Sequence, residues 1–340
     1  MRSKLAEVAY RGLNGVFAVY KPPGMAALQV KTTVQLNLLK DLNSLKQRPL
    51  KTMVKILRDT GQTDETKALT VTEVPSLADH PLAIGPRYQD IGIRWLTPLD
   101  RMASGIMVMA VEDGTRKLGM LHAAQFPSVY EIKGRLGIAT DTFDDTGKVI
   151  EKATHHHVTR EKIDRVVAAM MRVHQSAMTR FSGVDMQSQE AYELAVRGLL
   201  RPSLDKLPPI ILRMKCLHFE NPDFTIEMEC VKEEGAFLRK MAHEIGLEMK
   251  SAAVATQVRR ISQGPFNLEH ALLKKHWKLD YISEAIQICK PLVKKKKVLP
   301  YYKMKRTLPE EVFKELKETE AKLDIMKKRT TFLESGDNAS

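Results

Sequence analysis

A single carboxylate, Asp100, lies where its neighbouring segments would hold it at the edge of a folded core. Small residues follow at 103–105, and the apolar run 106–111, bounded by glycine-containing turns, has the length of a buried strand. The small residues leave space above the carboxylate, and the strand fixes its loop to the core. The stretch therefore suits a catalytic carboxylate, although an Asp that caps a turn fits the same residues.

The stretch 99–105, Leu-Asp-Arg-Met-Ala-Ser-Gly, resembles the motif L-D-P-x-A-T-G, which carries the nucleophilic aspartate of TruB-type pseudouridine synthases. Other motifs of this family occur in the same order. Residues 21–24 are similar to K-P-x-G, and residues 136–147 reproduce L-G-x-x-T-D-T-x-D-x-x-G almost letter for letter. Residues 232–239 resemble K-G-T-Y-I-R, and residues 258–266 resemble L-R-R-x-x-x-G-x-F.

The resemblance implies a role for individual residues. Asp100 falls on the nucleophilic aspartate, Tyr130 on the tyrosine that stacks on the target base, and Arg239 on the arginine of K-G-T-Y-I-R. These three residues form the predicted catalytic set. Without the resemblance, Arg239 is equally well explained as a surface arginine at a helix start.

Substrate contacts are expected around this catalytic set. The resemblance places Val258 against the uracil. Lys21 is expected either to orient its turn or to meet a phosphate, and Trp95 either to stack on a base, worth ~1–3 kcal/mol, or to pack as an ordinary buried tryptophan. The predicted substrate-binding residues are Lys21, Trp95, Phe237, Val258, Arg259 and Arg260.

The implied reaction breaks the bond from uracil N1 to C1′ of uridine, turns the base and rejoins it through C5. Asp100 would either attack C1′ or remove the C2′ proton, and the target base would be flipped out of its stem or loop. A carboxyl group in an apolar pocket tends to stay protonated, so we expect a cation beside it, and Arg239 is the candidate. Neither a cofactor nor a metal is implied.

Four positions depart from the family's pattern. Trp95 replaces a histidine, Ser128 and Asp185 each replace a lysine, and Phe237 replaces a tyrosine. These changes favour an alternative, a non-catalytic RNA-binding or assembly factor on the same fold, which the retained catalytic set opposes. A third alternative is the synthase branch with R-L-D-x-x-T-S-G, which residues 100–105 partly match, although the TruB-like sequence after residue 130 speaks against it.

Hydrophobic periodicity predicts the elements that must position these side chains. Period-two or short apolar patterns indicate strands at 16–20, 69–72, 106–111, 129–137 and 224–230. Period-3.6 patterns indicate three helices, whose apolar faces contain Val30, Val34, Leu38 and Leu42, then Leu118 and Leu121, then Leu238, Met241, Ala242 and Ile245. A further helix is expected to begin after Thr159, its N-cap residue. The resemblance implies the α/β (α+β) pseudouridine-synthase fold, with a mixed, mainly antiparallel sheet, flanking helices and no C-terminal PUA domain.

Composition limits the class of protein. A chain of 340 residues with 43% apolar content is globular, and a net charge of +13 favours a polyanionic partner, although organellar proteins are often basic without a dedicated groove. The three cysteines show no C-x-x-C spacing, and adjacent histidines at 155–157 do not easily converge on one ion, so no metal is expected. No apolar run approaches the roughly 20 residues needed to span a bilayer.

Three segments are expected along the chain. Residues 1–13 form a basic tail or a weak presequence, residues 14–290 the TruB-like catalytic domain with an insertion at 26–92, and residues 291–340 a basic tail with a capped helix at 309–328. The insertion is either an RNA-gripping segment or an insertion without function. The tail is either solvated or an additional contact to RNA or ribosome.

Within the family, the chain resembles the mitochondrial TruB-like paralogue of animals at 158–162, 189–193 and 243–247. This resemblance implies a location in the mitochondrial matrix. It also implies RNA as the partner, with mitochondrial messenger RNA as substrate and ribosomal RNA or tRNA as further candidates. Proteins of RNA granules or of ribosome assembly are implied as additional partners.

Overall fold

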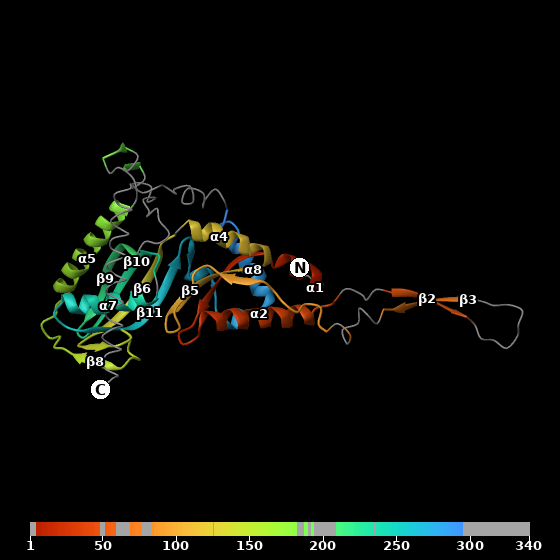
Figure 1. Ribbon diagram of the computed structural model, residues 1–340, viewed down its shortest axis with the longest axis horizontal. Coiled ribbons are helices and arrows are strands. Elements are labelled where there is room, and N and C mark those ends of the chain that lie inside the picture. The colour runs from red at the N-terminus through yellow and green to blue at the C-terminus, as the bar shows by residue number, and fades with distance from the viewer. Residues whose placement is uncertain are drawn as a thin grey trace, which may run out of the picture.

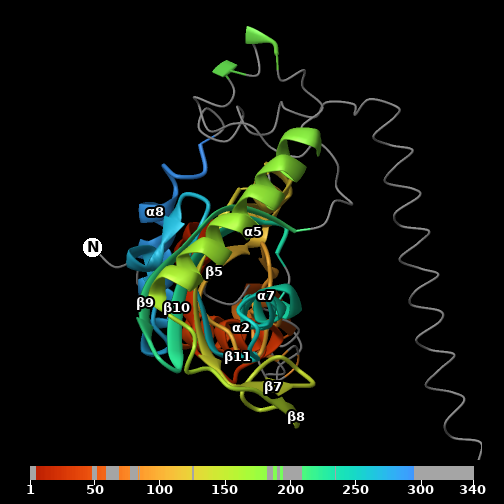
Figure 2. The same cartoon turned by 90° about the vertical axis from the view of Figure 1, so that its left-hand side faces the viewer.

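A mixed, mainly antiparallel sheet lies at the centre of the computed structural model, with helices on both faces (Figures 1 and 2). The structure describes residues 5–47, 52–58, 69–76, 83, 85–124, 126–181, 187–189, 192–193, 209–233 and 235–294. The strand order is β13-β1-β5-β11-β6-β10-β9, in which β1–β13 and β5–β11 are parallel pairs. The expected fold class is confirmed.

The sheet strands have these bounds: β1 (Gly15–Lys21), β5 (Ser104–Val111), β6 (Ser128–Leu136), β9 (Ile210–Glu220), β10 (Asp223–Val231), β11 (Ala253–Gln263) and β13 (Ala271–Leu272), with β4 (Ile93–Trp95) beside β5 and β12 (Phe266–Asn267) beside β11. Helices α1 (Ala6–Gly12), α2 (Ala27–Ser44), α4 (Thr115–Ala123), α5 (Arg160–Phe181), α7 (Gly235–Glu248) and α8 (Leu279–Cys289) cover it. The predicted strands and helices within the described residues are confirmed.

Strand β5 is buried on both faces, which explains its unbroken apolar sequence. Met107 and Met109 pack toward α2 and α8, whereas Ile106 and Val108 face α4 on the other side. The apolar stripe of α2, Val30, Val34, Leu38 and Leu42, is fully buried against the first of these faces. This packing anchors the loop that precedes β5, where Asp100 lies.

Helices α5 and α7 cover β6, β9, β10 and β11 in the other half of the sheet (Figure 2). Ile163 and Val167 of α5 are buried, and Val166 and Met170 pack at the edge of the same cluster, as the predicted face requires. The α7 stripe, Leu238, Met241, Ala242 and Ile245, is buried in that cluster as well. This packing leaves the N-terminal turn of α7 at the sheet, near Asp100.

Gly105 allows β5 and β11 to approach closely. Its φ is +116°, in the region that favours glycine, and an added Cβ would overlap the backbone of Arg260. Arg260 pairs with Gly105 in the parallel β5–β11 contact. The glycine that bounds the predicted strand is therefore required where the two halves of the sheet join.

Two smaller sheets lie outside the main one. Strands β7 (Ile138–Thr140) and β8 (Val149–Lys152) flank the turn of the 136–147 motif, and β2 (Thr52–Arg58) pairs with β3 (Leu69–Pro75) in a ribbon that extends from the body (Figure 1). Strand β3 contains the predicted strand at 69–72, whereas its partner β2 is an element that the sequence analysis does not predict. The predicted C-terminal helix lies outside the described residues.

Candidate active site

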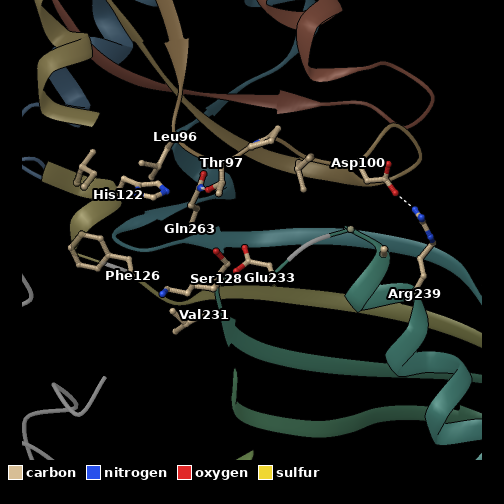
Figure 3. Close-up of a pocket in the computed structure, with 16 residues that line it drawn as sticks. Leu96, Thr97, Asp100, His122, Phe126, Ser128, Val231, Glu233, Arg239 and Gln263 are labelled. Carbon is tan, nitrogen blue, oxygen red and sulfur yellow. Dashed lines mark hydrogen bonds and ion pairs between the residues drawn. The ribbon is translucent and has the colours of Figure 1, made fainter. Parts of the chain in front are cut away.

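Asp100 and Arg239 meet in the structure. Asp100 lies in the loop between β4 and β5, and Arg239 lies in the first turns of α7, with an ion pair between Asp100 Oδ2 and Arg239 Nη1 (Figure 3). Their side chains are 31% and 20% exposed. Gly235, the first residue of α7, lies against the Asp100 side chain, so the positive end of the helix dipole also favours the carboxylate.

A second carboxylate, Asp144, holds Arg239 from the other side. The Arg239 Nε donates to the carbonyl of Thr142 at 3.2 Å and lies 3.8 Å from Asp144 Oδ2. Asp144 is itself fixed, because its Oδ1 accepts bonds from the Thr142 hydroxyl and from the amide and hydroxyl of Thr146. Asp144 belongs to the 136–147 motif, whose sequence alone indicates no role for this carboxylate.

Two hollows open beside the ion pair, and both are lined by Asp100 and Arg239. The larger measures about 700 Å³ and is also lined by Thr97, Ser128 and Glu233 (Figure 3). The smaller measures about 320 Å³, and Val258 lines it. Both volumes fall within the range of small-molecule sites, so either hollow has room for a nucleobase.

Tyr130 and Arg260 form a buried cluster with Glu233, which lines the larger hollow. The Tyr130 hydroxyl donates to Glu233 Oε1 at 2.6 Å, and Arg260 Nη1 donates to the same hydroxyl at 3.2 Å. Tyr130 is 2% exposed and Arg260 is fully buried. In this geometry the cluster encloses the Tyr130 ring and the Arg260 guanidinium, and the expected stacking of Tyr130 on a base and contact of Arg260 with substrate stay predictions.

Lys21 orients its turn, the first of its two expected roles. Its fully buried ammonium donates to the carbonyls of Pro22, Arg101 and Ala103, which ties the 21–24 turn to the loop after Asp100. Burial, with a smaller contribution from the charge of Arg260, lowers the pKa of Lys21 to about 8. These three carbonyl acceptors favour the turn-orienting role, and the contact of Lys21 with a phosphate stays a prediction.

Three other predicted substrate contacts lie away from the hollows. Trp95 is half-buried against the α2–α8 core with Lys31 over its ring, which is the ordinary packing role. Phe237 packs on the α5 side of α7, edge-on to His174. Arg259 lies over the ring of Tyr20. None of the three lines either hollow, and their assignment to substrate binding stays a prediction.

No cluster of three metal-ligating side chains occurs within the described ranges. The histidines at 155–157 are engaged elsewhere, since His155 bonds Asn221 and His157 bonds the carbonyl of Met249. Asp185, one of the positions that departs from the family's pattern, lies outside the described residues. None of the helices that the structure describes is both long and apolar enough to cross a bilayer.

Comparison with known proteins shows the family. The model described as TruB family pseudouridylate synthase (N terminal domain) matches residues 95–236, a range that includes Asp100 and the start of α7 and ends three residues before Arg239. A human protein named pseudouridylate synthase TRUB1 is 29% identical over 82% of this chain and 70% of its own length. A further relative, 45% identical over 85% of this chain and described next, shows that the chain belongs to the TruB family of pseudouridine synthases.

Two relatives with a higher identity to this chain are named as mitochondrial proteins. A Xenopus tropicalis protein named pseudouridylate synthase TRUB2, mitochondrial, is 45% identical over 85% of this chain and 89% of its own length. The human protein of the same name is 44% identical over 83% of this chain and 85% of its own length. The predicted resemblance to the mitochondrial branch is confirmed.

Proposed function

We propose that this chain isomerises uridine to pseudouridine in RNA, with Asp100 as the catalytic carboxylate and Arg239 as the cation that keeps it anionic. The observation that carries this proposal is the ion pair between the two residues in the wall of both hollows. Val258 beside the same carboxylate supplies an apolar surface for a base. The family's reaction needs a carboxylate and a space for the turning base.

The ion pair has a simple mechanistic purpose. Whether Asp100 attacks C1′ or removes the C2′ proton, it must carry a negative charge, and charge then develops at the anomeric carbon. A guanidinium in contact with the carboxylate favours the anion, and Asp144 holds that guanidinium in place. The target uridine must leave its base stack to reach the hollow.

The substrate and location follow from the relatives' names and the charge. Relatives named as mitochondrial support a mitochondrial location, and we propose the matrix as the compartment and mitochondrial messenger RNA as the main substrate, with ribosomal RNA or tRNA as further candidates. A net charge of +13 favours phosphate contacts. Proteins of RNA granules or ribosome assembly are proposed partners.

The alternative function, a non-catalytic RNA-binding factor, rests on the departures at Trp95, Ser128 and Phe237. Two of these side chains lie away from the hollows and therefore leave the ion pair untouched. Ser128 lines the larger hollow, where it removes one positive charge relative to the family's lysine. We therefore expect a change in RNA contact rather than a loss of chemistry.

The test uses a pool of mitochondrial transcripts made with uridine tritiated at C5. We expect the purified protein to release tritium into water, because C5 loses its hydrogen when it bonds to C1′. Asp100→Asn should abolish the release while RNA binding, measured by filter retention, persists. Asp164→Asn, which changes an exposed acid on α5, is the matched control and should keep the wild-type rate. Binding without release by the wild-type protein would instead support the non-catalytic factor.

A further inference from the structure

The larger hollow extends away from the ion pair to an end that the proposed reaction does not use. The target uracil is placed against Val258, which lines the smaller hollow and not the larger one. In the larger hollow, of about 700 Å³, Asp100 and Arg239 stand at one end (Figure 3). His122 and Phe126 stand at the other, which we call the distal end.

The distal end presents two ring planes beside an apolar wall. Leu96 lies next to His122 in the lining, and the buried Leu121 precedes His122 in α4 (Figure 3). Unstacked bases of RNA are commonly held by stacking on aromatic rings and on histidine. Apolar side chains cover the remaining surface of such a base. The chemistry of the distal end therefore suits a nucleobase.

The charge of the lining also favours a base over a phosphate. Ser128, which is only 3% exposed, lines the hollow where the family has a lysine. Among the described lining residues, the cations Lys232 and Arg239 are balanced by the carboxylates Asp100 and Glu233. Binding of a phosphate draws on unbalanced positive charge, whereas a stacked base needs none.

The two rings of the distal end are positioned by different elements. His122 lies in the last turn of α4, on the exposed side of a helix whose Leu118 is buried in the core. Its imidazole makes no hydrogen bond with the described residues, so both ring faces and both nitrogens are available to a ligand. Phe126 lies between α4 and β6 and packs against Gly264, which follows β11.

We propose that the distal end binds, by stacking, the base of the nucleotide directly before or after the target uridine. This inference rests on the proposed function, because that function places the target sugar at Asp100. From Asp100 one hollow leads to Val258 and the other to His122 and Phe126. A target base in the first hollow leaves the neighbouring nucleotide to enter the second. The neighbour leaves its base stack together with the target, and the distal end contributes to the choice of substrate.

The test is a double-mutant cycle between protein and RNA, with binding of the full-length protein measured by fluorescence anisotropy. The RNA is a hairpin from the mitochondrial transcript that the protein binds most tightly, with a single uridine in its loop. An abasic nucleotide replaces either neighbour of that uridine. At one of these two positions we expect the abasic change to weaken binding to the wild-type protein by about 5- to 150-fold, the worth of one stacked base.

The protein arm of the cycle removes the rings. In the double variant His122→Ala, Phe126→Leu the same abasic change should weaken binding by less than about twofold, because the lost stacking is already absent. His122→Tyr keeps a ring plane and should keep most of the sensitivity to the missing base. A neutral methylphosphonate at the same nucleotide should affect the wild-type protein and the double variant equally, because the proposed contact is with the base.

His218→Ala is the matched control, since it removes an exposed histidine of β9 that lines neither hollow, and it should keep the full sensitivity. Equal abasic losses in the wild-type protein and the double variant at both positions, or coupling to the methylphosphonate instead, would overturn the inference. Should the double variant not fold, His122→Ala alone decides, because its position is exposed. Coupling in a protein that releases no tritium would refute the proposed function and leave the base contact standing.

Discussion

The absence of one side chain, at Gly235, lets Asp100 meet Arg239. A Cβ at this position would lie 2.6 Å from the Asp100 Cβ and 3.0 Å from its carboxylate oxygen Oδ2, well inside ordinary van der Waals separation. Gly235 also begins α7, which carries Arg239. A side chain here would move the carboxylate relative to the guanidinium, so the geometry of the proposed catalytic pair depends on this glycine.

We expect Gly235→Ala to lower the rate of tritium release by about 100-fold, the cost of displacing a reacting group by an ångström. The circular dichroism spectrum and RNA binding should stay close to those of the wild type. Gly119→Ala is the control, since nothing lies within 4 Å of a Cβ added to that helical glycine, and it should keep full activity. An equally active Gly235→Ala protein would contradict the close packing described here.

At the level of elements, the packing of α5 on α7 brings a histidine into an apolar contact. His174 of α5 lies edge-on to Phe237 of α7, with ring centroids 6.4 Å apart. Burial lowers the pKa of His174 below its usual value near 6.5, while the charge of Glu244 opposes this shift. The folded protein therefore favours the neutral imidazole, so the stability of the packing between α5 and α7 depends on pH.

The sign of this coupling follows from proton binding. Below pH 6.5 the unfolded chain takes up the proton at His174 more readily than the folded protein does, so the free energy of unfolding falls as the pH drops from 7 toward 5. We expect His174→Phe to reduce this fall, measured by urea unfolding at several pH values. Parallel curves for the two proteins would show that His174 does not couple α5–α7 packing to pH.

On the scale of the whole molecule, the site lies where two packed halves join. Asp100 precedes β5, which packs with α2, α4 and α8, whereas Arg239 belongs to α7, which packs with α5 on the other strands. The two halves join through β5 and β11, and Arg260 of β11 donates across the join to carbonyls of the first half. The alignment of the catalytic pair therefore depends on the stability of both halves.

Trp277 lies in the core of the half of the molecule that carries Asp100, so replacing it tests the stability of that half. It is fully buried, its indole donates to the carbonyl of Leu272, and its own carbonyl accepts a bond from Asn37 of α2. We expect Trp277→Ala to lower the free energy of unfolding by about 3–5 kcal/mol, measured by denaturant unfolding. Trp95→Ala, at a half-exposed position, should cost less and leave tritium release unchanged. Equal losses would contradict the difference in burial.

The sequence by itself determined the local elements, the family and the most important pair. Strands and helices followed from hydrophobic periodicity, because each element must bury one face or both. The order of the motifs indicated the TruB family, and the motifs at 99–105 and 232–239 pointed to Asp100 and Arg239. Their contact was expected because a carboxylate in an apolar setting requires a cation, and the structure contains it.

Only the tertiary structure decided which polar side chains are buried. Lys21, Arg260 and Tyr130 have types that suit RNA contact, yet all three are enclosed by segments distant in the chain; Arg260, for example, donates to the carbonyl of Thr97, 163 residues away. The supporting roles of Asp144 and Glu233 arise in the same way. Exposure depends on which distant elements pack together, and no local pattern of residues records that.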